Sequence, residues 1–429
     1  MPEKNKSSNV SVWLVKSGEP IQTDPGITRL MRTGYLSEFL ANREASVTWW
    51  TSSFNHQKKS FRCLGSSRRT LPNNINIRLI ESPGYTRNIS IRRWADDIVL
   101  AYRILNRMNS EENVPKIIVC SYPLIFVSYA VSLYARKRNI PFILDVRDMW
   151  PDIFIYTNGR LKQYIMRFFS ALHQPFVKKI FSSAYSIVGM TDSFLNWGLD
   201  KAHRGKTKFD KVFPLSSEPV RISEKEINTA KNFWESWGVS SDMKIFCYFG
   251  VFSEKVDLFT VINSASKLSV ESNIKIVLCG TGDDFEKIAA FGKNVDNIIM
   301  PGWIDAAQIR VLMEMSIGGL APFKKRIDFL SSIPNKVIEY LSAGLPVISG
   351  IDGEIKQLID QYDCGVVYQE GDIDALTSIF ELISLDHKKR KYLSKQAVLT
   401  YRNEFEFQQV YGDYADYVLN QIQGEKNNC

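Results

Sequence analysis

Short apolar runs alternate with longer amphipathic stretches along the whole chain. The runs predict strands at residues 10–15, 46–51, 75–81, 116–121, 141–146 and 184–190, and again at 244–250, 274–280, 297–302, 317–323, 345–350 and 364–368. Between them apolar residues recur with helical spacing, for example over Ile27–Asn42, Leu258–Leu268 and Asp305–Met315. Strands that alternate with helices predict parallel sheets covered by helices.

The strands fall into two sets, which predicts two doubly wound α/β domains. A chain of 429 residues also exceeds what one hydrophobic core usually serves. Prolines and serines interrupt the periodicity at Phe213–Val220, so the expected domains are residues 1–214 and 215–400. Residues 401–429 carry an aromatic-rich helical pattern with no strand after it, and this helix is expected to cross back onto the first domain.

One uncharged segment, Ile117–Ala135, has the length of a membrane span. Pro123 interrupts this segment, and three serines dilute its apolar character. The pattern therefore favours a short strand, a turn at the proline and a buried helix, and with them a soluble protein.

The charge of the chain is unevenly distributed. The first 214 residues hold 32 Lys or Arg and 16 Asp or Glu, a net charge of +16, whereas the remainder carries −8. A basic half predicts an anionic partner, such as a phosphorylated substrate, a membrane surface or a nucleic acid; solvated surface charge is the alternative. No nucleic-acid recognition motif accompanies the charge, so nucleic acid is not an expected partner. Arg160–Ser183 mixes basic and aromatic residues, which fits either a helix on an anionic membrane or core packing.

Cysteine and histidine usage indicates neither disulfides nor a metal site. None of the six cysteines (Cys63, Cys120, Cys247, Cys279, Cys364 and Cys429) forms a Cys-x-x-Cys, and several stand inside apolar runs. They are expected to be reduced thiols of a cytoplasmic protein, since the N-terminus also lacks an apolar secretory segment. The four histidines show no metal-ligand spacing, so no protein-bound metal is expected.

Polar and glycine-rich loops follow the predicted strands, where ligands of open parallel sheets bind. In the first half these loops include "KSGEP" at residues 16–20 and "DVRDMWPD" at 145–152. In the second half they are "YFGVFSEK" at 248–255, "CGTGDD" at 279–284, "PGWIDA" at 301–306 and "APFKKRIDFLSSIPNK" at 321–336. Two domains with such loops predict a substrate held between them.

The stretch Phe323–Gly350 predicts a phosphate site at the start of a helix. Pro334 suits the first turn of a helix, and Gly344 suits its end. Free N–H groups and the positive end of the helix dipole would hold a diphosphate. Counter-charge would come from Lys324, Lys325, Arg326 and Lys336.

Glu339 lies one turn further into this predicted helix, on a polar stripe with Asn335. Its carboxylate could accept hydrogen bonds from two ribose hydroxyls, and a solvent-facing glutamate is an equal alternative. Gly280 and Gly282 form only part of a dinucleotide fingerprint, which fits a tight turn as well as a phosphate cradle. Arg147 and Asp148 are either an ion pair or contacts to substrate.

The segments "IPNKVIEYLSAGLPVIS" and "DVRDMWPD", supported by "KSGEP", "GTGDD" and "PGWIDAAQI", resemble the GT-B glycosyltransferases. Among these, the chain is similar to the retaining family 4 group that builds bacterial surface polysaccharides. The resemblance implies two Rossmann-like domains facing across a cleft, with a nucleoside diphosphate sugar in the second. It also implies a glycan or polyprenyl-diphosphate-linked acceptor in the first, and transfer without a metal or cofactor.

The resemblance carries roles over to particular residues. Glu339 would hold the ribose, and Lys255 would bind phosphate. Arg147 and Asp148 would lie near the transferred sugar, and together with Lys255 they would form the catalytic set. The further donor-binding residues would be Ser331, Ser332, Asn335, Lys336, Gly280 and Gly282, with Gly302, Trp303 and Ile304 at the base. Gly18 and Glu19 would lie on the acceptor side.

Two positions depart from the family pattern. Ser331 stands where the first glutamate of the family's paired motif is expected, eight residues before Glu339, and Val251 stands where many members carry an arginine. The resulting hypothesis is a cytoplasmic hexosyl- or N-acetylhexosaminyl-type transferase, peripheral on the inner face of the plasma membrane. A non-catalytic nucleotide-sugar-binding subunit of a transferase complex is the alternative, and a sugar-nucleotide epimerase fits less well because its acid and base groups are not evident.

Overall fold

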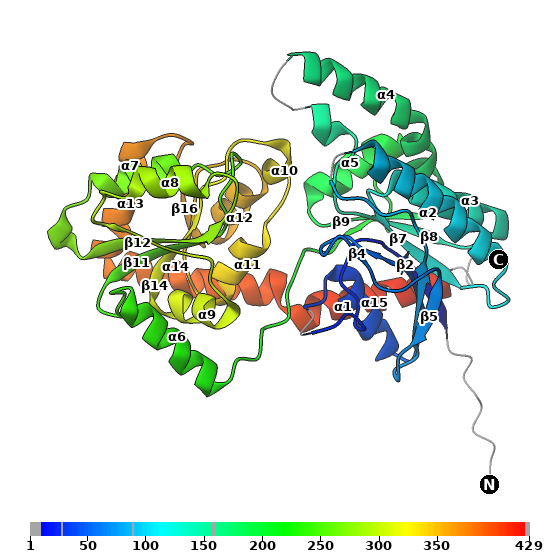
Figure 1. Cartoon of the computed structure of the whole chain (residues 1–429), viewed down its shortest axis with the longest axis horizontal. Coiled ribbons are helices and arrows are strands. Elements are labelled where there is room, and N and C mark those ends of the chain that lie inside the picture. The colour runs from blue at the N-terminus through cyan, green and yellow to red at the C-terminus, as the bar shows by residue number, and fades with distance from the viewer. Residues whose placement is uncertain (1–9, 27–28, 88–89, 156–159, 425–429) are drawn as a thin grey trace, which may run out of the picture. The chain divides into compact units, whose positions relative to one another are not determined.

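The computed structural model describes residues 10–26, 29–87, 90–155 and 160–424, without the side chains of residues 160–162 and 423–424. Ile27 and Cys429, and the side chains of Arg160 and Lys162, therefore lie outside the described residues. The chain divides into two compact units (Figure 1). The first unit comprises Met1–Pro214 with Gln408–Cys429, and the second comprises Leu215–Phe407.

The first unit is built on an eight-stranded sheet in the order β10-β9-β8-β7-β1-β2-β6-β5. Its strands pair in parallel except β5, which is antiparallel to β6. The order reverses between β1 and β7, where an open sheet usually binds its ligand. The strands are β1 (Ser11–Val15), β2 (Ser46–Ser52), β5 (Ser67–Thr70), β6 (Ile75–Ile80), β7 (Ile117–Tyr122), β8 (Phe142–Val146), β9 (Ser186–Gly189) and β10 (Lys211–Val212).

Helices cover both faces of this sheet, as the alternation of side chains along β1 shows. Val12 and Leu14 pack in one cluster with residues of helices α1 and α15. Trp13 points to the opposite face and stacks on Tyr134 of α3, with 5.5 Å between the ring centroids. The helices are α1 (Arg32–Ala41), α2 (Ile91–Asn109), α3 (Ile125–Arg138), α4 (Arg160–Ser183), α5 (Asp192–Ala202) and α15 (Phe407–Gly424).

The uncharged segment Ile117–Ala135 forms β7 and most of α3, which confirms the strand, turn and buried helix predicted for it. Among the described residues no helix is long and apolar enough to cross a membrane. The helix predicted over Ile27–Asn42 is wrong at its start, because α1 begins at Arg32 and residues 29–31 are not helical.

The last helix, α15, packs on the first unit through aromatic rings. Tyr414 stacks on Phe213 at 4.5 Å between ring centroids, and the Tyr417 hydroxyl donates to the Phe209 carbonyl at 2.7 Å. Arg43, in the turn that follows α1, donates from its Nη2 to the Gly412 carbonyl at 3.1 Å. The aromatic pattern of the C-terminal segment is therefore the apolar face with which α15 completes the core of the first unit.

The second unit is built on a six-stranded, wholly parallel sheet in the order β13-β12-β11-β14-β15-β16. The order reverses between β11 and β14, which makes this the switch point of the unit. The strands are β11 (Lys244–Val251), β12 (Ile274–Thr281), β13 (Ile298–Gly302), β14 (Ser316–Ala321), β15 (Val347–Ser349) and β16 (Gly365–Val367). All twelve strands predicted from the sequence are confirmed in the two sheets.

One or two helices follow each strand of the second unit, and α6 precedes the first of them (Figure 1). Two of them, α7 and α9, confirm the predicted helices at Leu258–Leu268 and Asp305–Met315 to within two residues. The helices are α6 (Glu224–Ser236), α7 (Leu258–Ser266), α8 (Phe285–Gly292), α9 (Ala306–Met315), α10 (Ile327–Leu330), α11 (Asn335–Ser342), α12 (Glu354–Tyr362), α13 (Ile373–Leu385) and α14 (His387–Thr400).

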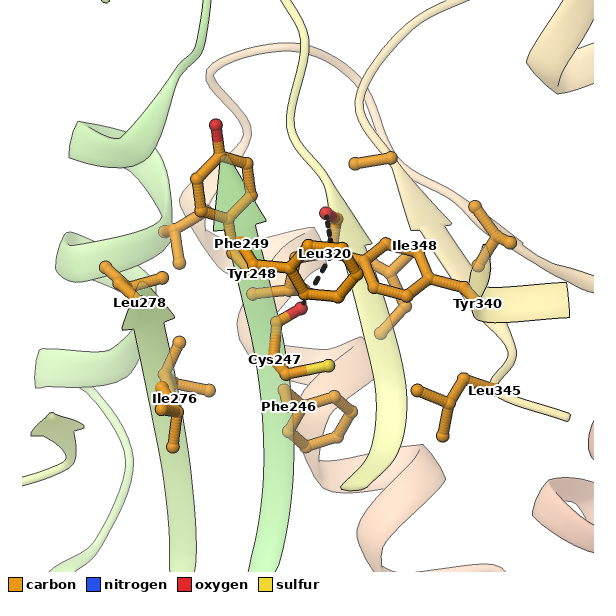
Figure 2. Close-up of a cluster of buried hydrophobic side chains, with 14 of the residues drawn as sticks. Phe246, Cys247, Tyr248, Phe249, Ile276, Leu278, Leu320, Tyr340, Leu345 and Ile348 are labelled. Carbon is orange, nitrogen blue, oxygen red and sulfur yellow. Dashed lines mark hydrogen bonds between the residues drawn. The ribbon is translucent and has the colours of Figure 1, made fainter. Parts of the chain in front are cut away.

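Tyr340 fixes helix α11 against the switch point of the second sheet (Figure 2). Its hydroxyl donates to the carbonyls of Cys247 on β11, at 3.3 Å, and Leu320 on β14, at 3.1 Å. A Cβ on Gly319 would lie 2.3 Å from the Tyr340 ring, so only glycine admits the ring at this depth. The helix that was predicted to bind phosphate is thus held beside the two central strands.

Candidate functional site

In the second unit, backbone contacts join the loops that leave β11 and β14. The amide of Lys324 donates to the carbonyl of Lys255 at 3.1 Å, and the amide of Asp257 donates to the carbonyl of Pro322 at 2.7 Å. Val256 and Phe323 form a bridge between the same loops. The predicted phosphate lysine, Lys255, therefore lies in a rigid pair of loops at the switch point.

Glycines allow the loops after β11 and β12 to approach one another. Gly250 and Gly280 are register partners, and a Cβ on Gly280 would lie 1.8 Å from the Gly250 carbonyl oxygen. A Cβ on Gly282 would lie 2.2 Å from the Phe252 carbonyl oxygen. Both Gly280 and Gly282 have positive φ, at +140° and +154°. The "CGTGDD" segment thus keeps two backbones close together at the carboxyl end of the sheet.

Helix α11 begins at Asn335, with Pro334 as its N-cap residue in extended conformation. The prediction that Pro334 lies within the first helical turn is wrong by one position. Gly344 follows the helix at φ +72°, as predicted for its end. The exposed Asn335 and the half-buried Lys336 thus form the first turn, and the half-buried Glu339 lies one turn later.

The Lys336 side chain turns inward, toward β11. Its Nζ lies 3.8 Å from the centroid of the Tyr248 ring and 5.1 Å from that of Phe323. A Cβ on Gly250 would lie 2.6 Å from the same Nζ, so the ammonium rests on the backbone of the β11 loop. Burial lowers the pKa of Lys336 to about 7, although the charge of Glu339 opposes the shift. This lysine can therefore gain or lose its charge near neutral pH.

Lys255 and Arg326 share one carboxylate, that of Asp328 on the short helix α10. The Lys255 Nζ lies 3.6 Å from Asp328 Oδ2, and the Arg326 Nε lies 3.2 Å from Oδ1. Lys255 remains 46% exposed. Of the other predicted cations, Lys325 pairs with Asp352 at 3.1 Å. Because the Lys255 pair is long and half exposed, it contributes little to stability and leaves the lysine accessible to a ligand.

The serines before α11 differ in exposure. Ser331 is 6% exposed and ends α10, whereas Ser332 is half-buried and donates to the Asp328 carbonyl at 2.6 Å. The amides of Ser331 and Ser332 donate to the carbonyls of Ile327 and Phe329 within α10. The short helix α10, absent from the sequence-based prediction, therefore binds the two amides nearest the expected phosphate loop.

Gly302 ends β13, and Trp303 and Ile304 follow it at the same edge of the sheet. Gly302 has φ +86°, and a Cβ there would meet no atom within 4 Å. Trp303 is 70% exposed, whereas Ile304 is buried in the core. An exposed indole next to an open glycine can stack on a planar ring, and Ile304 fixes the loop that carries it.

In the first unit, Arg147 belongs to a buried network of ion pairs. Its Nε lies 2.8 Å from Asp145 Oδ2, its Nη1 contacts Glu19, and its Nη2 donates to the Thr33 hydroxyl at 2.9 Å. Arg32 binds the same carboxylate, with its Nε 3.1 Å from Oδ2 and its Nη2 3.2 Å from Oδ1. The two guanidinium groups hold the pKa of Asp145 below its ordinary value against the cost of burial.

This network explains where the predicted residues of the first unit lie. Asp145 and Arg147 are two residues apart at the end of β8, so they point to the same side, and Arg147 pairs with Asp145 and Glu19. Asp148 points elsewhere, and its Oδ1 accepts a hydrogen bond from the Met149 amide at 2.8 Å. Glu19 is 2% exposed, whereas Gly18 beside it is half-buried at φ +90°.

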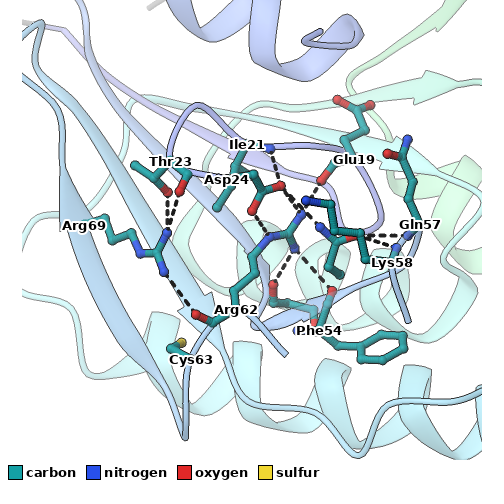
Figure 3. Close-up of polar contacts among 12 residues, drawn as sticks. Glu19, Ile21, Thr23, Asp24, Phe54, Gln57, Lys58, Arg62, Cys63 and Arg69 are labelled. Carbon is teal, nitrogen blue, oxygen red and sulfur yellow. Dashed lines mark hydrogen bonds and ion pairs between the residues drawn. The ribbon is translucent and has the colours of Figure 1, made fainter. Parts of the chain in front are cut away.

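A hairpin that the sequence did not reveal borders this edge of the first sheet. Its strands, β3 (Phe54–Asn55) and β4 (Ser60–Phe61), are held by Arg62, which pairs with Asp24 at 2.7 Å and donates to the Glu19 carbonyl at 2.8 Å (Figure 3). Both side chains of the Arg62–Asp24 pair are at most 5% exposed. The hairpin is thereby joined to the loop after β1.

Several residues of the two sites were not predicted, namely Arg32, Asp145, Tyr248, Phe323 and Asp328. One signal was available, because Asp145 interrupts the apolar run "FILDV", and a carboxylate within a buried strand requires a partner. The aromatic partners of Lys336 had no such signal. Among the described residues, no group of three or more His, Cys, Asp or Glu side chains is arranged to hold a metal ion.

Residues 231–399 match the model of a family described as "Glycosyl transferases group 1". No curated protein matches the sequence. Among solved structures, the chain is similar to sucrose-phosphate synthase from Thermosynechococcus elongatus, with a TM-score of 0.70 and 12% identity over 97% of this chain and 100% of that one.

Two further solved structures resemble the chain over nearly its whole length. The α,α-trehalose 6-phosphate synthase from Burkholderia multivorans gives a TM-score of 0.67 and 10% identity, covering 98% of each chain. The Anabaena protein HepE, in complex with UDP-glucose, gives a TM-score of 0.62 and 11% identity over 96% of this chain and 100% of that one. The chain therefore has the GT-B fold, and its second unit carries the sequence match to glycosyl transferases group 1.

Proposed function

We propose that the chain is a retaining glycosyltransferase that moves a sugar from a nucleoside diphosphate sugar to a glycan or lipid-linked acceptor in cell-surface polysaccharide biosynthesis. The observation that carries the proposal is the set of loops at the switch point of the second unit, where Lys255, Lys336 and the start of α11 converge. The solved structure of HepE with UDP-glucose supports a sugar nucleotide as the donor.

The charge that develops in this reaction lies on the departing diphosphate. Lys255, Lys336 and the amides of the first turn of α11 would stabilise it, because N–H groups at a helix start lack intrahelical partners. Glu339 would accept hydrogen bonds from the ribose, and Trp303 would stack on the base. The departing phosphate can itself take the proton of the acceptor hydroxyl, so the site requires no strong general base.

In the first unit, the buried network supports a positioning role for Arg147. It would hold Asp148 and the β1 loop in place for the acceptor, because its own donors bind Asp145, Glu19 and Thr33. Asp148 would orient the acceptor hydroxyl. Gly18, half-buried beside the buried Glu19, would lie on the acceptor side.

The test is a thermal-shift screen of UDP-, GDP-, ADP- and dTDP-sugars. A sugar nucleotide at a hundred times its dissociation constant stabilises the folded state by roughly 2.7 kcal/mol. We expect one nucleotide to raise the melting temperature, and the matching donor to lose its sugar to a suitable acceptor with retention at C1. If no sugar nucleotide shifts the transition, the proposed function is wrong.

The ribose role of Glu339 is tested by Glu339→Ala. We expect donor affinity to fall by about tenfold, as for the loss of a hydrogen bond to a charged group. The exposed Glu235→Ala of α6 is the control and should bind the donor as the wild type does. Unchanged affinity in Glu339→Ala would remove this residue from the ribose site.

A non-catalytic, nucleotide-sugar-binding subunit is the second candidate. Two observations favour it. Ser331, where the family has a glutamate, is 6% exposed and carries a hydroxyl in place of the carboxylate. Val251 stands in place of an arginine and is 65% exposed. Donor binding without transfer or donor hydrolysis, across a panel of acceptors, would establish this alternative. Turnover with any acceptor would exclude it.

We also propose that the first unit docks on an anionic membrane through an apolar stripe on α2 and α4. The Trp94 Nε1 of α2 donates to His173 Nε2 of α4 at 3.0 Å, so the two helices meet at these residues. Exposed lysines and arginines, including Arg92, Arg167 and Lys178, accompany the stripe. The stripe comprises Ile91, Trp94, Ile98 and Tyr102 of α2 and Tyr164, Ile165, Phe168 and Leu172 of α4, all exposed by 38% or more.

Co-sedimentation with vesicles of phosphatidylglycerol and phosphatidylcholine tests this docking. Leu172→Glu should weaken binding by at least about fivefold, since a leucine contributes roughly 1.5–3 kcal/mol when it is buried. Leu385→Glu, at an exposed leucine of α13, is the matched control and should leave binding unchanged. Equal effects of the two changes, or no sedimentation of the wild type, would contradict membrane docking.

A further inference from the structure

A cluster of cationic and aromatic side chains lies at the carboxyl edge of the first sheet, on loops that follow its strands and at the start of α2. We call it the His56 cluster. Each of its side chains is half-buried. The members are Lys16 after β1, His56 and Lys59 in the turn between β3 and β4, Tyr85 after β6, Arg93 in the first turn of α2 and Trp150 after β8.

Direct contacts join the members of the cluster. His56 Nδ1 lies 2.5 Å from the Tyr85 hydroxyl and 3.3 Å from the Lys59 Nζ. The Lys59 Nζ also lies 4.7 Å from the centroid of the Tyr85 ring. Arg93 packs between two aromatic rings, with its Cζ 5.5 Å from the Tyr85 centroid and 4.8 Å from that of Trp150. Aromatic faces thus orient these cations, at distances typical of cation–π contacts.

The turn that carries His56 and Lys59 is held rigidly. The buried Asn55 accepts hydrogen bonds from the amides of Gln57 and Lys58 at 3.0 Å each (Figure 3). The Arg62–Asp24 pair fixes the far strand of the hairpin to the loop after β1 (Figure 3). A Cβ on Gly18 of that loop would lie 3.7 Å from the His56 Cβ, so the turn closes over the proposed acceptor side.

Electrostatics show that the surroundings of His56 are positive. Burial, together with the positive charges of Lys59, Arg93 and Lys16, lowers the pKa of His56 to about 4. Among the described residues, the charges that shift this pKa are cations. Two carboxylates also act on Tyr85 and Arg93: Asp96, whose Oδ1 accepts a hydrogen bond from the Gly84 amide at 2.6 Å, and Asp97. Burial raises the pKa of Asp97 to about 7, so it opposes the cations only in part.

We propose that the His56 cluster binds a phosphate or diphosphate group of the acceptor, an inference that rests on the proposed transferase function. Lys16, Lys59 and Arg93 supply charge, and the neutral His56–Tyr85 pair, which uses one of its two protons in its own hydrogen bond, donates the other to the phosphate. Arg93 directly precedes Trp94 of the apolar stripe, so a phosphate held here could belong to a lipid whose chain extends along α2. A phosphorylated sugar would present the same chemistry.

The experiment compares two double variants that remove equal charge from the same turn and helix. Lys59→Gln with Arg93→Gln removes two members of the cluster. Lys58→Gln with Arg107→Gln removes two exposed cations outside the cluster, from the same turn and helix, and is the matched control. Titration calorimetry measures inorganic pyrophosphate, farnesyl diphosphate and glucose 6-phosphate against each full-length protein, in the presence of the saturating nucleoside diphosphate selected by the thermal-shift screen.

We expect at least one of the three probes to bind the wild type, and the cluster variant to bind it at least tenfold more weakly. The control variant should bind it within twofold of the wild type. Tighter binding of farnesyl diphosphate identifies a lipid source, and tighter binding of glucose 6-phosphate identifies a phosphorylated sugar. Binding of none of the probes, or equal losses in both variants, would overturn the proposal.

The failure of this inference can be told from failure of the proposed function. The nucleoside diphosphate should bind the cluster variant as it binds the wild type, because its site belongs to the second unit. If it binds while no probe does, only the phosphate site is wrong. If no nucleotide binds the wild type, the transferase function itself is wrong. The single variant Lys59→Arg, which keeps the positive charge, should retain probe binding. This result would show that the cluster variant loses binding because it loses charge and not because its structure changes.

Discussion

Both units have cations at the carboxyl ends of their central strands, but the arginines of the first unit and the lysines of the second differ in burial and in pairing. In the first unit, Arg32 and Arg147 are almost fully buried and share Asp145 at 2.8–3.1 Å. In the second unit, Lys255 is 46% exposed and lies 3.6 Å from its carboxylate, while Lys336 rests on aromatic rings. The first arrangement satisfies its charges internally, and the second leaves them open to a ligand.

The difference separates structural charge from functional charge. A buried, fully paired arginine is costly to disturb and has few donors left for substrate. A loosely paired lysine costs little to leave unpaired and gains much from a diphosphate. Removing charge from the Arg32–Asp145–Arg147 network should therefore destabilise the first unit, whereas removing the charge of Lys255 should weaken ligand binding in the second.

The largest effect is expected for Asp145→Asn. This change leaves two buried guanidinium groups without their shared carboxylate, so the free energy of unfolding should fall by about 3–5 kcal/mol. Urea unfolding followed by circular dichroism measures it. Asp360→Asn, which breaks the exposed Lys356–Asp360 pair, should cost less than about 0.5 kcal/mol. Similar losses in the two variants would show that the first network is not structural.

Gly280→Ala is expected to have the next largest effect. The new Cβ would meet the Gly250 carbonyl oxygen, so stability should fall by about 3 kcal/mol and donor binding should weaken with it. Gly371→Ala is the control, because it has φ +83° and no atom within 4 Å of the new Cβ. It should lose only about 1 kcal/mol of conformational strain. Equal losses would mean that the close approach of β11 and β12 does not matter.

Lys255→Ala should separate binding from stability. Removing a charge-assisted contact should weaken binding of the sugar nucleotide by roughly 10–100-fold, or about 1.5–3 kcal/mol. Stability without ligand should stay within about 0.5 kcal/mol of the wild type, since the Asp328 pair is half exposed. Calorimetry and urea unfolding measure the two quantities. If Lys255→Ala lowers stability but binds the sugar nucleotide normally, the charge of Lys255 is structural, and the stated difference between the two units is wrong.

The smallest effect concerns the pH dependence of donor binding. With a pKa of about 7, Lys336 is largely neutral above pH 7 in the free protein. A bound diphosphate favours its ammonium form and opposes the loss of charge caused by burial, as Glu339 already does. Affinity for a sugar nucleotide should therefore fall as pH rises from 7 to 8, by up to about tenfold. Calorimetry in buffers of different ionisation enthalpy should show proton uptake, and Lys336→Met should abolish it.

The sequence predicted the sheets well because buried parallel strands are continuous apolar runs. All twelve such runs became strands, whereas β3, β4, β5 and β10 were missed. Three of the missed strands have only two residues, and β5, with the sequence "SRRT", carries no apolar residue. These segments are strands through their pairing partners and anchors such as Arg62, which local sequence does not encode.

The sequence predicted which loops form the candidate site, because loops follow from the order of strands and turns along the chain. It did not predict which side chains contact one another in the folded protein. The loops around Lys255, Gly280 and α11 follow from strand ends and turn residues. Which cation pairs with which carboxylate does not, because Glu19 and Arg147 are 128 residues apart. The neighbouring Arg147 and Asp148 suggested a pair, but the alternation of side chains at the end of a strand directs Arg147 to Asp145 instead.

The most direct test of the central claim is a crystal structure of the protein with the sugar nucleotide that the thermal-shift screen selects. We predict diphosphate oxygens within hydrogen-bond distance of Lys255 Nζ and of the amides at the start of α11, with the pentose hydroxyls at the Glu339 carboxylate. A nucleotide bound elsewhere, with Lys255 still paired to Asp328 and no ligand at α11, would contradict it.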